Sequence, residues 1–261
     1  MKKILALLLV AAMVLTFAGC VAGNPDNTKP SENKSTEPKP TQTTAPKFDP
    51  AAKEEGSMTY AQYDAAALDS QVVVECYVQA AQGWWFDSKA NHGKITVYAQ
   101  DPDGAYFLYE MKCEEADAAK LVAGTKIKVT GYKAEWSGEV EVVDATFEIM
   151  EGTWTAEPMD ATALLGKDEL IKHQNKLASF KAMTVEKIEF KNGEPGDDIY
   201  VTVSKDGASY SFCVEMYLTG PDTDVYKAVS ALKAGDVVDI QGFLYWYEGV
   251  NTHITAVAAS K

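Results

Sequence analysis

The chain of 261 residues contains no arginine: all 24 of its basic residues are lysine, against 38 Asp and Glu, and its net charge at pH 7 is −14. Residues 1–50 hold six Lys and four acidic residues, which leaves 18 Lys, 34 acidic residues and a charge of −16 for residues 51–261. Recognition of a phosphate backbone relies on cationic patches and favours the bidentate guanidinium. The composition therefore disfavours nucleic acid as a partner, and it also disfavours electrostatic binding to an anionic membrane.

Motifs that carry enzymatic chemistry are also missing. The three histidines, His92, His173 and His253, stand at no spacing typical of metal ligands. The sequence has no Gly-x-Ser-x-Gly nucleophile motif, no Gly-rich loop before a Lys-Ser/Thr pair and no Cys-x-x-Cys. We therefore expect no catalytic residues, no metal and no cofactor, and we predict that the protein is not an enzyme.

Cysteine is scarce, with four in the chain. Cys20 lies in an N-terminal signal, so Cys76, Cys113 and Cys213 remain, and an odd number cannot all pair. Cys76 and Cys213 fall inside predicted strands, where a thiol behaves as a small hydrophobic side chain. A bridge between Cys76 and Cys113 is left open by the sequence.

The N-terminus reads as an export signal over residues 1–20. Two lysines precede a short apolar run, Ile4 to Phe17, and Ala18-Gly19-Cys20 follows. This ending resembles the lipobox of bacterial lipoproteins, although Phe17 stands where Leu is usual. The resemblance implies cleavage before Cys20, lipid on its thiol and a position at the extracellular face of the cell membrane. An ordinary signal peptide or an uncleaved anchor is the alternative.

A polar segment follows the signal. Residues 24–47 contain five of the ten prolines and Ala45 as their only hydrophobic residue. Such a composition does not offset the entropy of ordering. We expect residues 21–56 to form a disordered Pro/Thr/Lys-rich linker.

The rest of the chain contains an internal repeat. Gly124–Tyr132 aligns without a gap with Gly235–Phe243, an offset of 111 residues. The match continues at Trp136/Tyr247 and at the glycine two residues later in each copy. A repeat of this length indicates duplication of a whole structural unit.

Each copy predicts three strands, a helix and two strands, from alternating β-branched residues and from turn residues between them. The expected strands are 72–80, 94–100, 105–111, 125–132 and 140–149 in the first copy, and 177–189, 198–204, 208–215, 237–245 and 252–258 in the second. The expected helices are 114–122 and 223–232, and Thr59 to Gln62 forms a capping box that opens a helix before the first strand.

This order resembles the OB-fold, a five-stranded Greek-key barrel with a helix between its third and fourth strands. The fold expected is all-β with short helices: two tandem OB barrels, 57–150 and 151–261, after a disordered linker. The whole chain is similar to the tandem OB-fold lipoproteins of Gram-positive bacteria, a group with no defined activity.

An OB barrel binds ligands on the face of its second and third strands, next to the one–two and four–five loops. The first one–two loop carries Trp84, Trp85 and Phe86, and the first four–five loop carries Trp136. Strand alternation predicts Tyr98, Tyr106 and Leu108 on the outer face. It places the following residues inside the barrel: Ile95, Val97, Ala99, Phe107, Tyr109 and Met111. The aromatic loop is either a ligand platform or a plug over the end of the barrel.

These features predict a lipid-anchored, extracellular, non-catalytic binding or assembly module. Its expected ligand is a surface glycan, peptide or protein, engaged by the aromatic face of the first barrel. The alternative is a single-stranded nucleic-acid-binding OB-fold protein at the cell surface, because bases stack on exposed aromatic rings.

Overall fold

The computed structural model describes residues 48–261. The predicted signal peptide 1–20, the lipidation of Cys20 and the linker as far as residue 47 lie outside the described residues. Residues 48–56, also expected in the linker, instead pack against the first sheet. Lys53 Nζ lies 2.6 Å from Asp101 Oδ2, and the backbone N of Glu54 donates to Glu75 Oε1 at 2.9 Å. The linker prediction is therefore wrong over these residues, because Asp101 and Glu75 are buried carboxylates that need donors.

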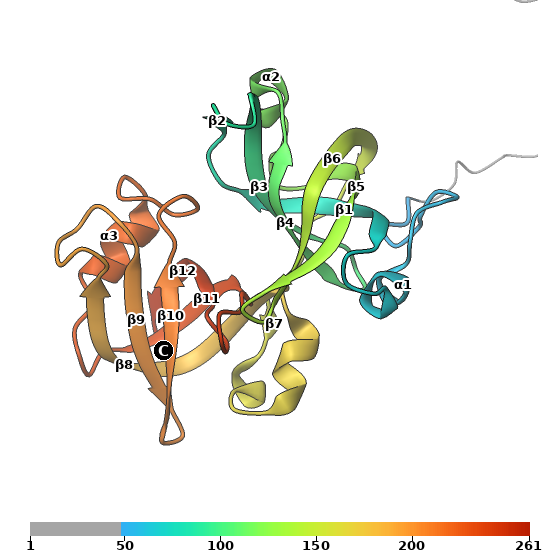
Figure 1. Ribbon diagram of the computed structural model, residues 1–261. Coiled ribbons are helices and arrows are strands. Elements are labelled where there is room, and N and C mark those ends of the chain that lie inside the picture. The colour runs from blue at the N-terminus through green and yellow to red at the C-terminus, as the bar shows by residue number, and fades with distance from the viewer. Residues whose placement is uncertain (1–47) are drawn as a thin grey trace, which may run out of the picture. The chain divides into compact units, whose positions relative to one another are not determined.

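The first sheet has six strands in the order β1-β5-β6-β4-β3-β2, and β1 pairs with β3 as well as with β5 (Figure 1). Its elements are α1 (Tyr60–Ala65), β1 (Gln71–Ala81), β2 (Trp85–Asp87), β3 (His92–Gln100), β4 (Ala105–Lys112), α2 (Glu115–Ala118), β5 (Thr125–Trp136) and β6 (Glu139–Thr153). Helix α1 opens with the predicted capping box, in which Thr59 and Gln62 bond each other's backbone N–H groups.

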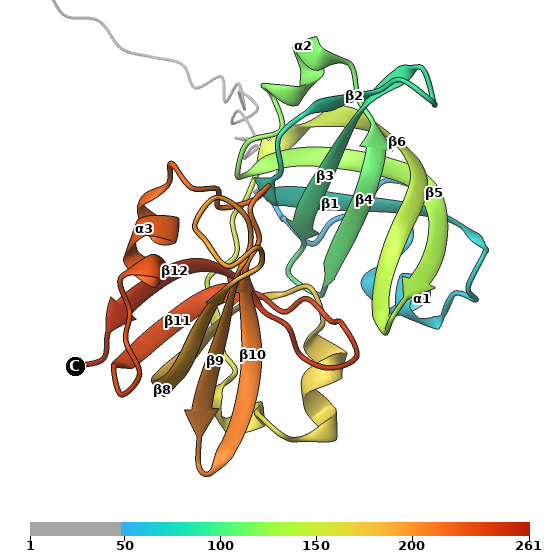
Figure 2. The ribbon, with the colours of Figure 1, turned by 60° about the vertical axis from the view of Figure 1, so that its left-hand side comes forward.

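The second sheet also has six strands, in the order β11-β12-β10-β9-β8-β7, and β8 pairs with both β9 and β11 (Figure 2). Its elements are β7 (Met159–Asp160), 3₁₀ helices at Thr162–Leu164 and Asp168–His173, β8 (Leu177–Phe190), β9 (Ile199–Lys205), β10 (Ala208–Val214), α3 (Asp224–Ser230), β11 (Val237–Phe243) and β12 (His253–Ala259). The prediction of a β-sheet protein with short helices is confirmed.

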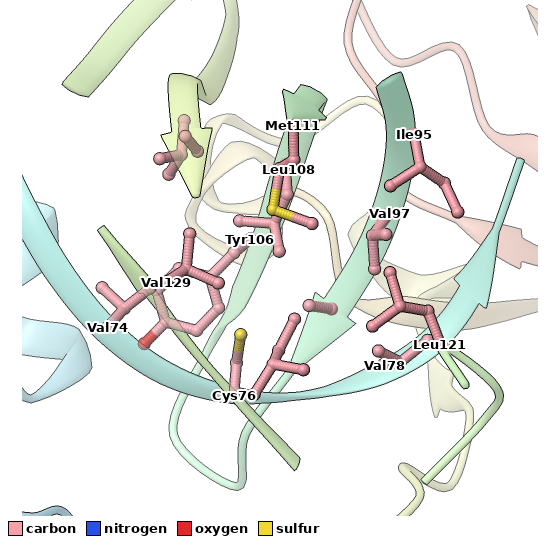
Figure 3. Close-up of a cluster of buried hydrophobic side chains, with 14 of the residues drawn as sticks. Val74, Cys76, Val78, Ile95, Val97, Tyr106, Leu108, Met111, Leu121 and Val129 are labelled. Carbon is pink, nitrogen blue, oxygen red and sulfur yellow. The ribbon is translucent and has the colours of Figure 1, made fainter. Parts of the chain in front are cut away.

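Alternating residues of the strands build the first core. Figure 3 shows the side chains of β1, β3 and β4 meeting there, with Cys76 and Tyr106 among them. The core includes Val72, Val74, Val78, Ile95, Val97, Ala99, Leu108, Met111, Ile127 and Val129. The residues of β3 predicted to point inward, Ile95, Val97 and Ala99, all belong to this core, so the faces of this strand were predicted correctly.

The parity predicted for β4 is wrong over most of the strand. Tyr106 and Leu108 point into the core, whereas Tyr109 is 41% exposed. Val97 pairs with Leu108 but Ile95 pairs with Met111, so β4 has one extra residue between these pairs. Glu110 takes up the irregularity with a φ of 46°. A strict alternation counted back from Met111 ignores this bulge. It therefore assigns the residues of β4 that precede Glu110 to the wrong face of the strand.

Candidate ligand-binding site

Trp84 plugs the first core. The side chain is half-buried and packs against the core, and its Nε1 donates to the backbone oxygen of Cys113 at 3.0 Å. Gly93 makes room for it, because a Cβ at that position would overlap both the indole and the Cys113 carbonyl. Trp84 is therefore a plug over the first core and not part of an exposed ligand platform.

The next two aromatic residues are exposed. Trp85 and Phe86 lie on β2 with 43% and 53% of their surface accessible, and as neighbours on a strand they face opposite sides. Trp85 pairs with Lys94 of β3, whose Nζ lies 5.3 Å from the centre of the indole ring. This distance is that of a cation–π contact. Trp85 thus presents a ring whose position a neighbouring strand fixes.

Tyr106 is not on the outer face. It is fully buried, its ring packs edge-on against Tyr60 and Tyr63, and its hydroxyl donates to Asp101 Oδ2 at 2.9 Å. The expectation that Tyr106 belongs to an exposed platform is wrong, because the bulge at Glu110 reverses the faces on which the earlier residues of β4 lie.

Tyr98 does point outward, but the second half of the chain covers it. Its ring stacks on Phe243 at 4.6 Å between centroids, and its hydroxyl lies 2.6 Å from His253 Nδ1. Phe107 packs beside it against Tyr245 at 5.2 Å. The expectation that Tyr98 faces a ligand is wrong, because Phe243 and His253 of the second repeat cover this part of the outer face.

Polar contacts complete this boundary between the sheets. Gln82 Nε2 donates to Glu215 Oε2 at 2.9 Å, and the backbone N of Trp246 donates to Glu139 Oε2 at 2.8 Å. Glu139 is fully buried, its Oε1 has no partner among residues 48–261, and burial raises its pKa to about 8. Burial likewise lowers the pKa of His253 to about 3.

Trp136 lies at the turn between β5 and β6 and is 53% exposed. Its ring is 5.3 Å from that of Tyr247, the residue at the equivalent place in the second copy. The two turns also share a hydrogen bond from the Glu248 N–H to the Ser137 carbonyl, 2.8 Å long. The structure therefore groups Trp136 with Tyr247, and its ring makes no contact with Trp85 within the described region.

The part of the outer face that stays open is a groove of about 410 Å³. Side chains of three strands line it: His92 and Lys94 of β3, Tyr109, Glu110 and Lys112 of β4, and Glu141 of β6. Its size falls within the range of small-molecule sites, roughly 300–1,000 Å³. Sequence reasoning missed Tyr109, Glu110 and Glu141; the acidic alternation Glu139-Val140-Glu141 within a strand was the available signal.

Ion pairs fix one side of the groove. Lys94 Nζ lies 2.8 Å from Glu110 Oε2 and 2.9 Å from Asp87 Oδ2. These hydrogen bonds raise the pKa of Lys94, and the bond from Lys94 is the main reason that the pKa of Asp87 falls to about 2. Lys94 therefore stays charged, with both neighbouring carboxylates committed to it.

Glu141 behaves differently. It is 9% exposed, and its carboxylate has no side-chain hydrogen bond or ion pair with any residue from 48 to 261. Burial, and then the charge of Glu110, raise its pKa to about 7. The groove thus holds an acidic group that lacks a partner.

The described residues contain no group of three or more His, Cys, Asp or Glu that could hold a metal ion. Cys76, Cys113 and Cys213 are free and buried, so the bridge left open between Cys76 and Cys113 is absent. Burial raises the pKa of all three thiols. Over residues 48–261 the structure contains no helix long and apolar enough to cross a membrane.

No family model matches the chain, and no curated protein matches it. Among solved structures, a murine DNA-binding protein bound with double-stranded DNA shares 12% identity over 72% of this chain and 96% of its own, with a TM-score of 0.35. The HINa domain of Ifi202 in complex with a 20-bp double-stranded DNA shares 11% identity over 74% of this chain and 100% of its own, with a TM-score of 0.34. A replication protein A heterotrimer bound to single-stranded DNA shares 10% identity over 76% of this chain and 51% of its own, with a TM-score of 0.32.

These neighbours correct one expectation from composition. The low content of basic residues disfavoured nucleic acid as a partner, yet the similar structures were solved with double-stranded or single-stranded DNA. The net charge of a chain is a global quantity, whereas binding depends on the charges of one face. Net charge alone therefore does not make nucleic acid an unlikely partner, and that expectation is withdrawn; a likeness with TM-scores of 0.32 to 0.35 assigns no partner to this chain.

Proposed function

We propose that the chain is a non-catalytic binding module, built from two OB-type barrels, whose ligand lies in the groove between β3, β4 and β6. The pairing of β1 with both β3 and β5, and of β8 with both β9 and β11, closes each sheet and supports the barrels. One observation carries the binding site: an open groove with the unpartnered Glu141 on one wall, next to the exposed ring of Trp85.

A glycan or peptide suits this arrangement, because aromatic faces and carboxylates together contact sugar rings, hydroxyl groups and peptide side chains. Single-stranded nucleic acid is the second candidate. The observation that favours it is the pair Trp85 and Lys94, a stacking surface beside a fixed cation, with Lys112 as the neighbour of Lys94 on β4.

A fluorescence titration with oligosaccharides, peptides and single-stranded oligonucleotides tests the site. Trp85→Ala should weaken binding about 5- to 150-fold, since one aromatic stacking contact is worth about 1–3 kcal/mol. Phe86→Ala, which removes the neighbouring exposed ring from the opposite face, is the matched control and should retain affinity. Equal affinity of wild type and Trp85→Ala for every ligand that binds would refute the site.

A second change separates the ligand classes. Replacing Glu110 and Glu141 by Gln removes negative charge from the groove, so a polyanion should bind more tightly, and its dependence on salt should persist. A glycan or peptide that uses these carboxylates should bind more weakly.

We also propose that the protein is an exported lipoprotein held at the extracellular face of the membrane by lipid on Cys20. The support is the signal-like segment with Ala18-Gly19-Cys20 and the proline-rich segment after it. Mass spectrometry of the mature N-terminal peptide tests this. A peptide that starts before Cys20, or an unmodified thiol, would refute it.

A further inference from the structure

Glu141 is the feature of the groove that needs a partner. It lies on β6, where it pairs with Phe107 of β4 and with Ala134 of β5, so the strand backbone fixes its position. Nine-tenths of the residue is buried, yet no cation reaches its carboxylate in the described part of the chain. Its carboxylate oxygens stay open to the groove, and a carboxylate that has lost most of its surrounding water gains from pairing with a cation.

The lysines of the groove do not supply this cation. Lys94 is held between Asp87 and Glu110 at 2.9 and 2.8 Å. Lys112 is exposed and forms no ion pair within residues 48–261. Two lysines thus stand against four carboxylates, those of Asp87, Glu110, Glu141 and Asp144, and the local charge favours a positively charged guest.

An aromatic ring stands on the same wall. Tyr109 is 41% exposed and lines the groove with Glu110 and Glu141. The face of a tyrosine ring attracts an ammonium group placed within about 6 Å of its centre. Carboxylates and a ring face together form a typical environment for an alkylammonium ion.

We propose that the groove recognises a ligand through a protonated primary amine that pairs with Glu141 and lies against Tyr109. This deepens the proposed function, on which it rests, by naming the chemical group that the groove binds. The amine belongs to a lysine side chain or to an amino sugar, and the two sources are separated by the probes below.

The ionisation of Glu141 gives the interaction a pH dependence. The titratable and charged groups around Glu141 come from three strands of the first sheet and from the second sheet: His92 and Lys94 of β3, Tyr109, Glu110 and Lys112 of β4, Glu139 and Asp144 of β6, and Tyr245. Because the pKa of Glu141 is about 7, the carboxylate is mostly protonated at pH 6 and mostly charged at pH 8. A lysine side chain keeps its proton over this range, whereas the amine of a glucosamine loses its proton near neutral pH, so the pH dependence is predicted for the lysine peptide alone. Affinity for that peptide should therefore rise with pH.

The experiment is an NMR titration of ¹⁵N-labelled residues 48–261, which contain every helix and strand of the two sheets and their cores, with two matched pairs of probes. One pair is a tripeptide, acetyl-Gly-Lys-Gly-amide, and its Nε-acetyl-lysine form; the other is a glucosamine trimer and its fully N-acetylated form. We expect the amine of at least one pair to shift amides of β3, β4 and β6, and its acetylated partner to bind at least tenfold more weakly.

Glu141→Gln should weaken binding of the amine about 10- to 100-fold and, for the lysine peptide, remove the rise of affinity between pH 6 and pH 8. Glu148→Gln is the control, since it removes the same charge from an exposed position on the same strand and should change affinity less than twofold. Equal binding of amine and acetylated probe, equal binding by Glu141→Gln, or no shifts with either amine would overturn the proposal.

These outcomes separate the two levels of inference. If the amines fail but an oligosaccharide, peptide or oligonucleotide of the wider panel shifts the same amides, the ammonium proposal is wrong and the groove stands. If no probe shifts amides of β3, β4 and β6, the proposed binding site is wrong as well.

Discussion

Replacing Glu139 by Gln should make the protein more stable at alkaline pH. The carboxyl is fully buried at the contact between the two sheets and accepts one backbone hydrogen bond, from Trp246 at 2.8 Å. Burial raises its pKa from 4.5 to about 8, so the native state favours the protonated form. Glutamine has the same shape, retains an acceptor and is neutral at every pH.

The sign follows from proton linkage. Between pH 4.5 and pH 8 the native state binds more protons at Glu139 than the unfolded chain does, so stability falls as pH rises. His253 acts in the opposite direction: its pKa of about 3 in the native state adds stability as pH rises towards 6.5. From pH 6.5 to 8 the contribution of His253 no longer changes, so Glu139, with a smaller contribution from Glu141, sets the slope. At about 1.4 kcal/mol per pH unit, the titration of Glu139 should lower the free energy of unfolding by about 2 kcal/mol between pH 6.5 and pH 8.

Urea denaturation at pH 6.5, 7, 7.5, 8 and 8.5 measures this slope. Wild type should lose about 2 kcal/mol of unfolding free energy, with a smaller added loss from Glu141, whose pKa is about 7. Glu139→Gln should lose less than about 1 kcal/mol, and the exposed Glu148→Gln should follow wild type. If Glu139→Gln lost stability as steeply as wild type, Glu139 would not be the buried acid that titrates.

The remaining predictions concern the aromatic residues. Trp84→Ala should lower the free energy of unfolding by about 3–5 kcal/mol, because it empties a packed position and removes the hydrogen bond to Cys113. Trp85→Ala should change the free energy of unfolding by less than about 0.5 kcal/mol, because its ring is exposed. Thermal melts compare the two variants, and equal melting temperatures would contradict the interpretation of Trp84 as a plug. Tyr98→Phe should cost about 1–3 kcal/mol by leaving His253 Nδ1 buried without its partner, and an unchanged urea midpoint would argue against that hydrogen bond.

The elements of the fold were predictable because their signals are local. Alternation gave each of the long strands, and the Thr59–Gln62 pair gave the start of α1. The repeat at an offset of 111 residues added an independent check, since two diverged copies gave the same order of elements. Strands β2 and β7, of three and two residues, were missed, because such short segments have too few positions for a period to appear.

The site was less predictable because its residues depend on irregularities and on distant contacts. The bulge at Glu110 shifts the register of β4 and exchanges Tyr106 for Tyr109 on the outer face, and no turn residue marks it in the sequence. Tyr98 has the predicted direction, but the residues that cover it lie about 145 positions later. Lys53 was assigned to a linker by its neighbours' composition, although its charge matches the buried Asp101.

Glu139 and Glu141 connect the two parts of this surface. They lie two residues apart on β6, so both side chains leave the same side of the strand: one enters the contact between the sheets, and the other enters the groove. A negative charge on Glu141 raises the pKa of Glu139. An ammonium group on Glu141 cancels that charge, so ligand binding ionises the groove carboxyl without adding uncompensated charge beside the buried contact. A cation is therefore the guest that satisfies the open acid and leaves the sheet contact undisturbed.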